Sequence, residues 1–98
     1  AEMTPLAEQI KTSLRIRNAA LDDEIEFNVG TCLCDLIRVG ISATYAIETT
    51  ENALIKKACE LYCKSEFNFN GDGERFKVAY EGFRDALSLD GDLNAVNE

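Results

Sequence analysis

Hydrophobic residues recur with the period of an α-helix in four separate segments of this chain. The first helix is predicted to begin at Thr4–Pro5, because threonine is a favourable N-cap and proline suits the first helical position. Its apolar stripe consists of Leu6, Ile10 and Leu14. With no convincing strand in the sequence, the pattern predicts an all-α fold, a small bundle of about four helices.

The second helix is predicted over about residues 19–39, with Asn18 as its N-cap and Gly40 as its end. A sustained apolar stripe marks its core face, and a thinner second line runs beside that stripe: Phe27, Thr31, Cys34 and Arg38. Phe27 lies off the main stripe, so it belongs either to a wide core face or to a contact between subunits.

The remaining elements follow from turn signals and periodicity. A loop or short extended segment is expected over 41–49, and Thr50 is the expected cap of a central third helix over about 51–66. The polar run 68–73 predicts a plain turn, because a calcium loop would need glutamate where Ala79 stands. The fourth helix is predicted over about 74–88, and Gly82 within it allows another helix to approach closely.

These elements predict one helical domain over residues 4–89, followed by a flexible acidic tail over residues 90–98. Met3 is the expected natural start, which makes residues 1–2 a cloning remnant. No basic region followed by an apolar run marks a secretory signal, and the apolar stretches are too short to cross a membrane.

The net charge is −8, from 18 acidic and 10 basic residues, and this argues against a protein that grips nucleic acid. An acidic surface suits a protein that DNA slides past, or one that mimics DNA. The acids of the second-helix start favour the helix dipole and need no active site to explain them: Asp22, Asp23, Glu24 and Glu26. The one concentrated basic patch is either a solvated face or a contact: Lys11, Arg15 and Arg17.

The side chains offer little catalytic chemistry. The chain has no histidine, which is the usual neutral-pH base and the commonest metal ligand. Its four cysteines are expected to be buried, reduced thiols rather than disulfide or zinc partners: Cys32, Cys34, Cys59 and Cys63. We therefore expect a protein that is not an enzyme and that has no cofactor and no metal.

Several segments, in order, resemble a known family. They are Ile10–Ile16 (IKTSLRI), Leu21–Ile25 (LDDEI), Ile55–Lys64 (IKKACELYCK), Glu74–Glu81 and Leu87–Asp92. Together they resemble the head–tail connector proteins of bacteriophages and prophages, also called adaptor or head completion proteins. Phe76 and Phe83 stand where the family is expected to carry tyrosine and an aliphatic residue, and 41–49 matches nothing in it.

The resemblance implies a helical, non-catalytic protein that forms a ring on the portal of a DNA-filled head. The ring, a dodecamer by family likeness although the free protein can be a monomer, extends the DNA channel and docks the stopper or tail-completion protein. DNA passes through it without sequence-specific binding, and no membrane is involved. The implied location is the head–tail interface of the virion, after synthesis in the host cytoplasm.

This implied function assigns roles to surface residues. The acids of the second-helix start are expected to face the channel: Asp22, Asp23, Glu24 and Glu26. Subunit or partner contacts are expected from a basic patch and the second line of the second helix: Lys11, Arg15, Arg17, Phe27, Cys34 and Arg38. The tail is a candidate portal contact, or else a frayed terminus, through Leu89, Asp90, Asp92 and Leu93.

Two other classes remain open. One is an acidic helical interaction module, such as a DNA mimic that inhibits a nucleic-acid-binding protein. Mimics spread their acids over a continuous face, whereas basic residues interrupt the acids here: Lys56, Lys57, Lys64, Arg75 and Lys77. The other is a metal or redox protein that uses the cysteines, which the absence of histidine disfavours.

Overall fold

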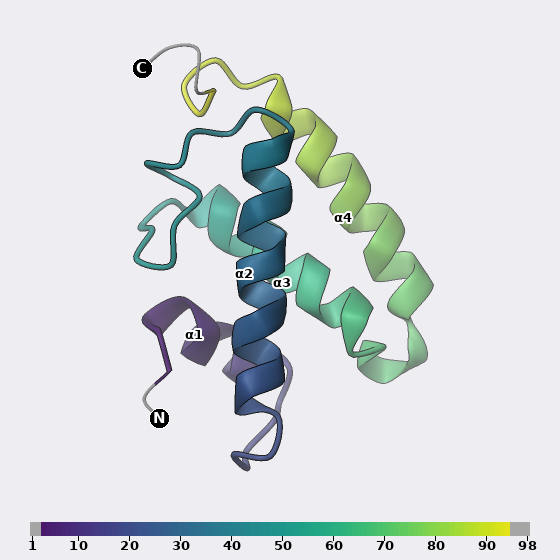
Figure 1. The fold of residues 1–98 in the computed structure, drawn as a ribbon. Coiled ribbons are helices and arrows are strands. Elements are labelled where there is room, and N and C mark those ends of the chain that lie inside the picture. Colours follow the sequence, from purple (N-terminus) through teal and green to yellow (C-terminus); the bar gives the residue numbers. More distant parts are fainter. Residues whose placement is uncertain (1–2, 95–98) are drawn as a thin grey trace.

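The computed structural model describes residues 3–94, and helices make up most of this range (Figure 1). The elements are α1 (Pro5–Ser13), α2 (Asp22–Arg38), α3 (Ala53–Glu66), the short 3-10 turn η1 (Phe69–Gly71) and α4 (Gly73–Ser88). The described residues form no strand, and a single isolated bridge joins Ile41 to Asn94. The predicted all-α fold is confirmed.

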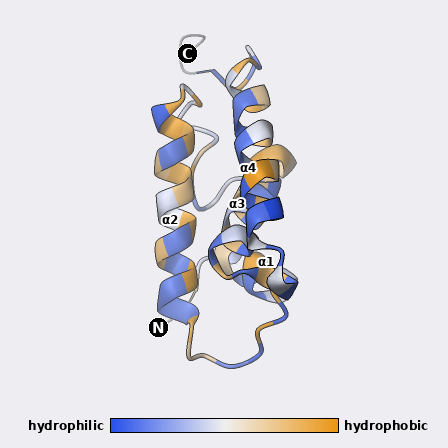
Figure 2. Ribbon diagram, turned by 90° about the vertical axis from the view of Figure 1, so that its right-hand side faces the viewer, coloured by the Kyte–Doolittle hydropathy of each residue, from blue (hydrophilic) through white to orange (hydrophobic). Residues whose placement is uncertain are grey.

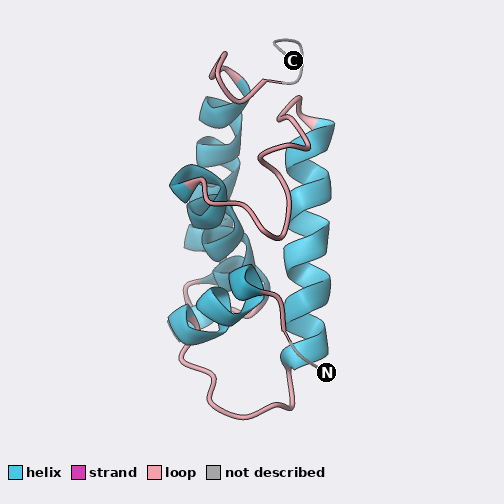
Figure 3. Cartoon of the chain, turned by 90° about the vertical axis from the view of Figure 1, so that its left-hand side faces the viewer, coloured by secondary structure: helices cyan, strands magenta, loops and turns pink. Residues whose placement is uncertain are grey.

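The helices form two layers in a flat molecule that measures 41 × 30 × 18 Å. Seen from the two sides, α2 stands as one layer and α1, α3 and α4 form the other (Figures 2 and 3). The third helix is the centre of the fold, as predicted, because it contacts all three other helices. Its Ile55 is fully buried, together with Ile25 and Leu36 of α2.

The first helix begins as predicted, but two other helix starts differ from the prediction. The helix α2 begins at Asp22 because the Asn18 Oδ1 accepts a hydrogen bond from the Ala20 N–H (3.0 Å), which forms a local turn before the helix. The N-cap of α3 is Asn52, whose Oδ1 accepts bonds from the first turn of the helix. Thr50 instead accepts a bond from the Asn52 N–H (3.2 Å).

Several apolar residues of the helices lie on the surface. Ile37 and Leu54 are 44% and 42% exposed, and Ala79 is also exposed. In a thin two-layer molecule, only one side of each helix meets a partner, so a broad apolar stripe is not fully covered. Gly82 is not a site of close helix approach, because a Cβ placed there would have no atom within 4 Å.

The segment 41–49 forms a loop, as predicted, and it holds the end of the described chain. Leu93 is only 3% exposed, and its carbonyl accepts a hydrogen bond from the Ser42 N–H (2.7 Å). Burying a leucine side chain stabilises this contact by about 2 kcal/mol. Leu93 of the predicted flexible tail is therefore held against the 41–49 loop, whereas residues 95–98 and 1–2 lie outside the described residues.

Candidate functional site

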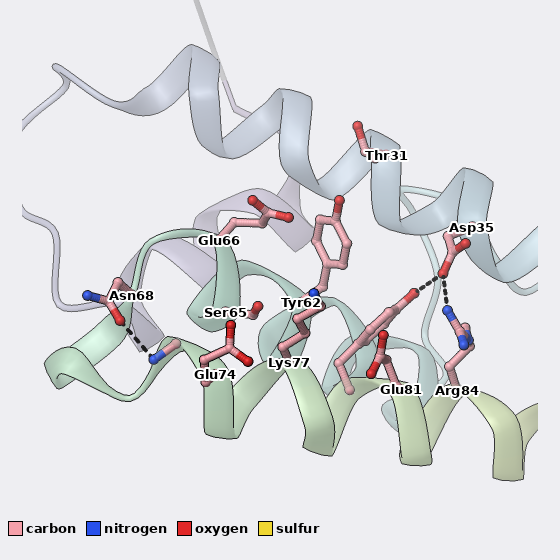
Figure 4. A pocket seen from close by; sticks show the side chains of 12 residues that line it. Thr31, Asp35, Tyr62, Ser65, Glu66, Asn68, Glu74, Lys77, Glu81 and Arg84 are labelled. Atoms are coloured by element: carbon pink, nitrogen blue, oxygen red, sulfur yellow. Dashed lines mark hydrogen bonds and ion pairs between the residues drawn. The ribbon is translucent and has the colours of Figure 1, made fainter.

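A groove of about 590 Å³ lies between α2 and α4, with the C-terminal half of α3 as its floor (Figure 4). The two walls exist because α2 and α4 both pack on α3. Thr31 and Asp35 of α2 form one wall, and Tyr62 forms part of the floor. The remaining lining comes from α3, the turn and α4: Ser65, Glu66, Asn68, Gly73, Glu74, Lys77, Tyr80, Glu81 and Arg84.

The groove is predominantly acidic. Its lining carries four carboxylates and two cationic side chains, so its net charge is −2: Asp35, Glu66, Glu74 and Glu81 against Lys77 and Arg84. Among the described residues, no ion pair within 4.0 Å involves Glu66, Glu74 or Glu81. The carboxylates of Glu66 and Glu74 point into the space between α2 and α4 (Figure 4).

One end of the groove is closed by a polar network around Asp35. The Asp35 Oδ2 accepts hydrogen bonds from the Tyr80 hydroxyl (2.7 Å) and from the Arg84 Nη1 (3.1 Å). Its Oδ1 accepts bonds from Arg38, at 2.9 and 2.7 Å. The Tyr80 ring meets Tyr62 edge-on, with 5.1 Å between the ring centroids. This network ties α2 to α4 and fixes the width of the groove at that end.

The pKa values of the network match a structural role. Partial burial by itself raises the pKa of Asp35, but the hydrogen bonds from Tyr80, Arg38 and Arg84 outweigh it, so the pKa lies below its usual 3.8. Burial, with the neighbouring Cys32 and Asp35, raises the pKa of Tyr80. At neutral pH the carboxylate is therefore ionised and the phenol remains protonated, which keeps the hydrogen bond between them in place.

The acids at the start of α2 divide into two kinds. Asp22 forms an ion pair with Lys11, 2.6 Å between Oδ1 and Nζ, and Glu26 accepts a hydrogen bond from the Thr4 hydroxyl (2.9 Å). Both contacts hold α1 against α2. Asp23 and Glu24 are exposed and form no ion pair with any described residue.

The predicted basic patch divides in the same way. The Lys11 side chain is 19% exposed, and its ion pair with Asp22 is partly buried between α1 and the start of α2. Arg15 and Arg17 are exposed in the loop between α1 and α2, and neither forms an ion pair within the described range. The predicted patch therefore consists of two exposed arginines in the loop and one lysine that is paired within the subunit.

Comparison with known proteins identifies the family. A family model described as "Phage connector protein" matches residues 6–93, which is nearly the whole chain. The chain belongs to the phage connector family. Membership supports a structural role as a component of the virion that interacts with other virion proteins. No curated protein and no solved structure matches the chain. None of the helices in residues 3–94 combines the length and the apolar character that crossing a bilayer requires.

The second line of α2 lies on the surface of this connector. Phe27 is 73% exposed, so its assignment to a wide core face is wrong, whereas a subunit contact remains a prediction. Cys34 is exposed as well, and the Arg38 side chain is 65% exposed although it pairs with Asp35. These residues follow one another along α2 beside the groove, and Thr31 of the same line forms part of its wall.

The residues predicted to meet the portal lie at the opposite end of the molecule from the α1–α2 loop (Figure 1). Leu89 is 86% exposed just after α4, and the Asp90 carboxylate accepts a hydrogen bond from the Asp92 N–H (2.9 Å). Leu93 is buried and anchors this turn to the 41–42 segment. Leu89, Asp90 and Asp92 are therefore accessible, and Leu93 is not.

The cysteines are all free, and three of the four are buried as predicted: Cys32, Cys59 and Cys63. Cys34 is exposed because two residues of helix turn it about 200° from Cys32. Burial raises the pKa of Cys63 to about 12, and the hydrogen bond with Cys32, together with burial, raises that of Cys59. Protonated thiols pack as small hydrophobes and are poor nucleophiles. Residues 3–94 offer no cluster of three or more potential metal ligands.

Sequence reasoning missed the groove residues of α3 and α4. Glu74, Lys77 and Glu81 are spaced as i, i+3 and i+7, so they share one face of α4, and this spacing was visible in the sequence. A polar face of this kind is ordinarily only solvated. The structure gives it meaning by placing Glu66 of α3 and the wall of α2 opposite it.

Proposed function

We propose that this connector forms a ring on the portal, extends the DNA channel beyond it and docks the stopper or tail-completion protein. The family match over residues 6–93 is the observation that carries the proposal. The anionic surface supports it, because a net charge of −8 per subunit discourages DNA from adhering to the ring. The three buried cysteines contribute to packing, and the carboxylate of Asp35 is held by hydrogen bonds between α2 and α4.

We propose that fewer residues line the channel than the four acids expected from the sequence. Asp23 and Glu24 are exposed at the N-terminal end of α2, and no described cation neutralises them. Asp22 and Glu26 already serve contacts within the subunit. We therefore assign the channel-facing role to Asp23 and Glu24, whose repeated charge around a ring repels the DNA backbone.

The proposed partner surfaces lie at separate places on the subunit. Neighbouring subunits are met by the α1–α2 loop and by the outer line of α2, through Arg15, Arg17, Phe27, Cys34 and Arg38. The portal is met by the exposed turn after α4, where Leu89 is an apolar side chain with 86% exposure. In the proposed contact, the exposed Leu89 side chain enters an apolar pocket of the portal and the neighbouring Asp90 lies at its edge.

Electron microscopy of the connector mixed with purified portal protein tests this function. The expected result is a ring of connector density on one face of the portal. A mixture in which the connector never associates with the portal would contradict the proposal. If the connector does not bind the portal but binds a purified host DNA-binding protein in a separate binding assay, the DNA-mimic class would be favoured.

The channel assignment has its own test. Rings of the wild-type connector are expected not to retain duplex DNA, whereas rings carrying Asp23→Lys and Glu24→Lys are expected to retain it at low salt. The matched control is Glu48→Lys with Glu51→Lys, which changes the charge equally in the loop before α3. Equal DNA retention by both double variants would show that Asp23 and Glu24 do not face the channel.

A further inference from the structure

Two oppositely charged features of the subunit, the loop between α1 and α2 and the groove between α2 and α4, are not paired with each other within residues 3–94. The loop of residues 14–21 carries Arg15 and Arg17, both exposed and without an ion pair among the described residues. This loop joins the two layers at one end of the molecule and extends beyond the helices there (Figure 3). The groove between α2 and α4 has a net charge of −2, and none of its lining residues comes from that loop.

Arg15 has a backbone conformation that is unfavourable for any residue with a Cβ atom. The Ile16 N–H donates to the Lys11 carbonyl (3.2 Å) and the Arg15 N–H to the Thr12 carbonyl (3.0 Å), which is the Schellman arrangement at a helix end. Arg15 occupies its left-handed position with φ +61°, where glycine is the favoured residue. An arginine in a glycine position, with its side chain in solvent, indicates a role outside the folding of the subunit.

The groove contains carboxylates and an aromatic ring, which arginine side chains bind well. Glu66, Glu74 and Glu81 supply carboxylates, which guanidinium groups engage through two parallel hydrogen bonds. Tyr62 adds an aromatic surface to the floor, and guanidinium groups stack favourably on aromatic rings. Phe27, one helical turn from the lining residue Thr31, is 73% exposed and can cover the aliphatic part of an arriving side chain.

The spacings of the two charged sets are compatible. Arg15 and Arg17 are separated by two residues, at most about 7 Å along the chain. Glu74 and Glu81 are separated by seven residues of α4, which is about 10.5 Å along its axis. The flexible side chains of two arginines cover this difference of about 3.5 Å. The loop therefore has the reach, as well as the charge, to occupy the groove of another molecule.

We propose that the 14–21 loop of one subunit docks into the α2–α4 groove of the next subunit in the ring. This inference rests on the proposed function, because it specifies the contact that joins neighbouring subunits. The loop and the groove are different surfaces, so the contact is head-to-tail, and repetition of a head-to-tail contact generates a ring when the rotation closes. Each subunit donates one loop and accepts one.

A charge-reversal experiment on ring assembly tests the contact. One variant carries Arg15→Glu and Arg17→Glu, and the other carries Glu74→Lys and Glu81→Lys. Each variant alone has a loop and a groove of like charge, so its association into rings on the portal is expected to weaken at least about tenfold. An equal mixture is expected to regain assembly with alternating subunits, because each loop then meets a groove of opposite charge. Electron microscopy and the mass of the complex report both results.

Matched controls and the wild type separate the possible failures. Lys56→Glu with Lys57→Glu, and Glu48→Lys with Glu51→Lys, change the net charge equally outside the loop and the groove and are expected to leave assembly unchanged. Wild-type protein that forms no ring on the portal would refute the proposed function. Wild-type rings together with full assembly of each reversed variant, or with a mixture that never recovers, would refute only the docking of the loop. Loss of binding to the stopper protein alone would show that the groove accepts a different partner.

Discussion

The two short connections of this fold, α1–α2 and α3–α4, solve the same backbone problem in different ways. In both, the chain enters a left-handed conformation soon after a helix ends, at Arg15 (φ 61°) and at Asn68 (φ 48°). Asparagine tolerates this conformation, and the Asn68 Oδ1 also accepts a hydrogen bond from the Gly73 N–H (2.8 Å) at the start of α4. Arg15 gains neither benefit, since its side chain is exposed and not paired within the described range.

The difference distinguishes a connection whose side chains stabilise the subunit from one whose side chains are available to a partner. The α3–α4 connection uses its side chains to cap a helix and to hold two elements together. The α1–α2 connection accepts a less favourable residue and presents positive charge to solvent. The proposed docking of this loop would account for an arginine at a position that favours glycine, as a trade of subunit stability for function.

The largest expected effect is at Gly73, where the α3–α4 connection is most tightly packed. A Cβ at this position would lie 2.7 Å from the Asn68 Oδ1 and 3.1 Å from the Ser65 carbonyl oxygen. Gly73→Ala is therefore expected to lower the free energy of unfolding by about 2–3 kcal/mol, measured by urea denaturation. The same change at Gly82, which has open space around it, is expected to raise it by about 0.5–1 kcal/mol. Equal effects of the two substitutions would contradict this description of the turn.

Asn68 itself is expected to contribute nearly as much. Asn68→Ala removes the bond to the Gly73 N–H and places alanine in a left-handed conformation, so the loss is about 2 kcal/mol. Asn70 has the same backbone hand (φ 55°), but its side chain caps no helix. Asn70→Ala is therefore expected to cost about half as much. Thermal unfolding of the two variants distinguishes capping from backbone preference, and a larger loss at Asn70 would show that capping is unimportant.

Asp35 differs from the other carboxylates of the groove, because its hydrogen bonds stabilise the fold of the subunit. Its folded-state pKa lies below 3.8, so its hydrogen bonds stabilise the fold above the unfolded-state pKa and are lost as the pH falls through the folded value. Asp35→Asn is expected to cost about 1–2 kcal/mol at pH 7, with the difference from wild type shrinking below about pH 4. Glu81→Gln, at an exposed and unpaired position, is the control and is expected to leave stability unchanged at both pH values. A cost for Asp35→Asn that is constant with pH would show that the carboxylate charge is not involved.

The smallest expected effect is a gain at Arg15. Relief of the left-handed strain contributes about 1–2 kcal/mol, and the greater freedom of glycine in the unfolded chain offsets about 0.4–1 kcal/mol of it. Arg15→Gly is thus expected to stabilise the isolated subunit by about 0.5–1 kcal/mol while it weakens ring assembly. Arg17, whose φ is not positive, serves as the control, and Arg17→Gly is expected to be destabilising. A fall in stability for Arg15→Gly would remove the contrast between the two connections.

The sequence predicted the helices better than their capping residues. Thr4 caps α1 and Gly40, with φ 108°, ends α2, because both act through the local backbone. Asn18 and Thr50 have the right chemistry for caps, but each is used in a turn just before its helix. Residues of one type compete for these roles within a few positions, and neighbouring contacts decide which of them is used.

The net charge could be predicted from the sequence, but which charged residues form ion pairs and which stay exposed could not. The net charge of −8 and the helical periods follow from the sequence, since both are set by residue types and their spacing. Only the folded chain pairs Lys11 with Asp22 and leaves Arg15 and Arg17 exposed, because ion pairs depend on distances between helices that are remote in sequence. The groove also depends on the tertiary structure, since Glu66 and Glu74 belong to separate helices that α3–α4 packing brings together. Leu93 likewise is buried only because a loop some fifty residues earlier packs against it.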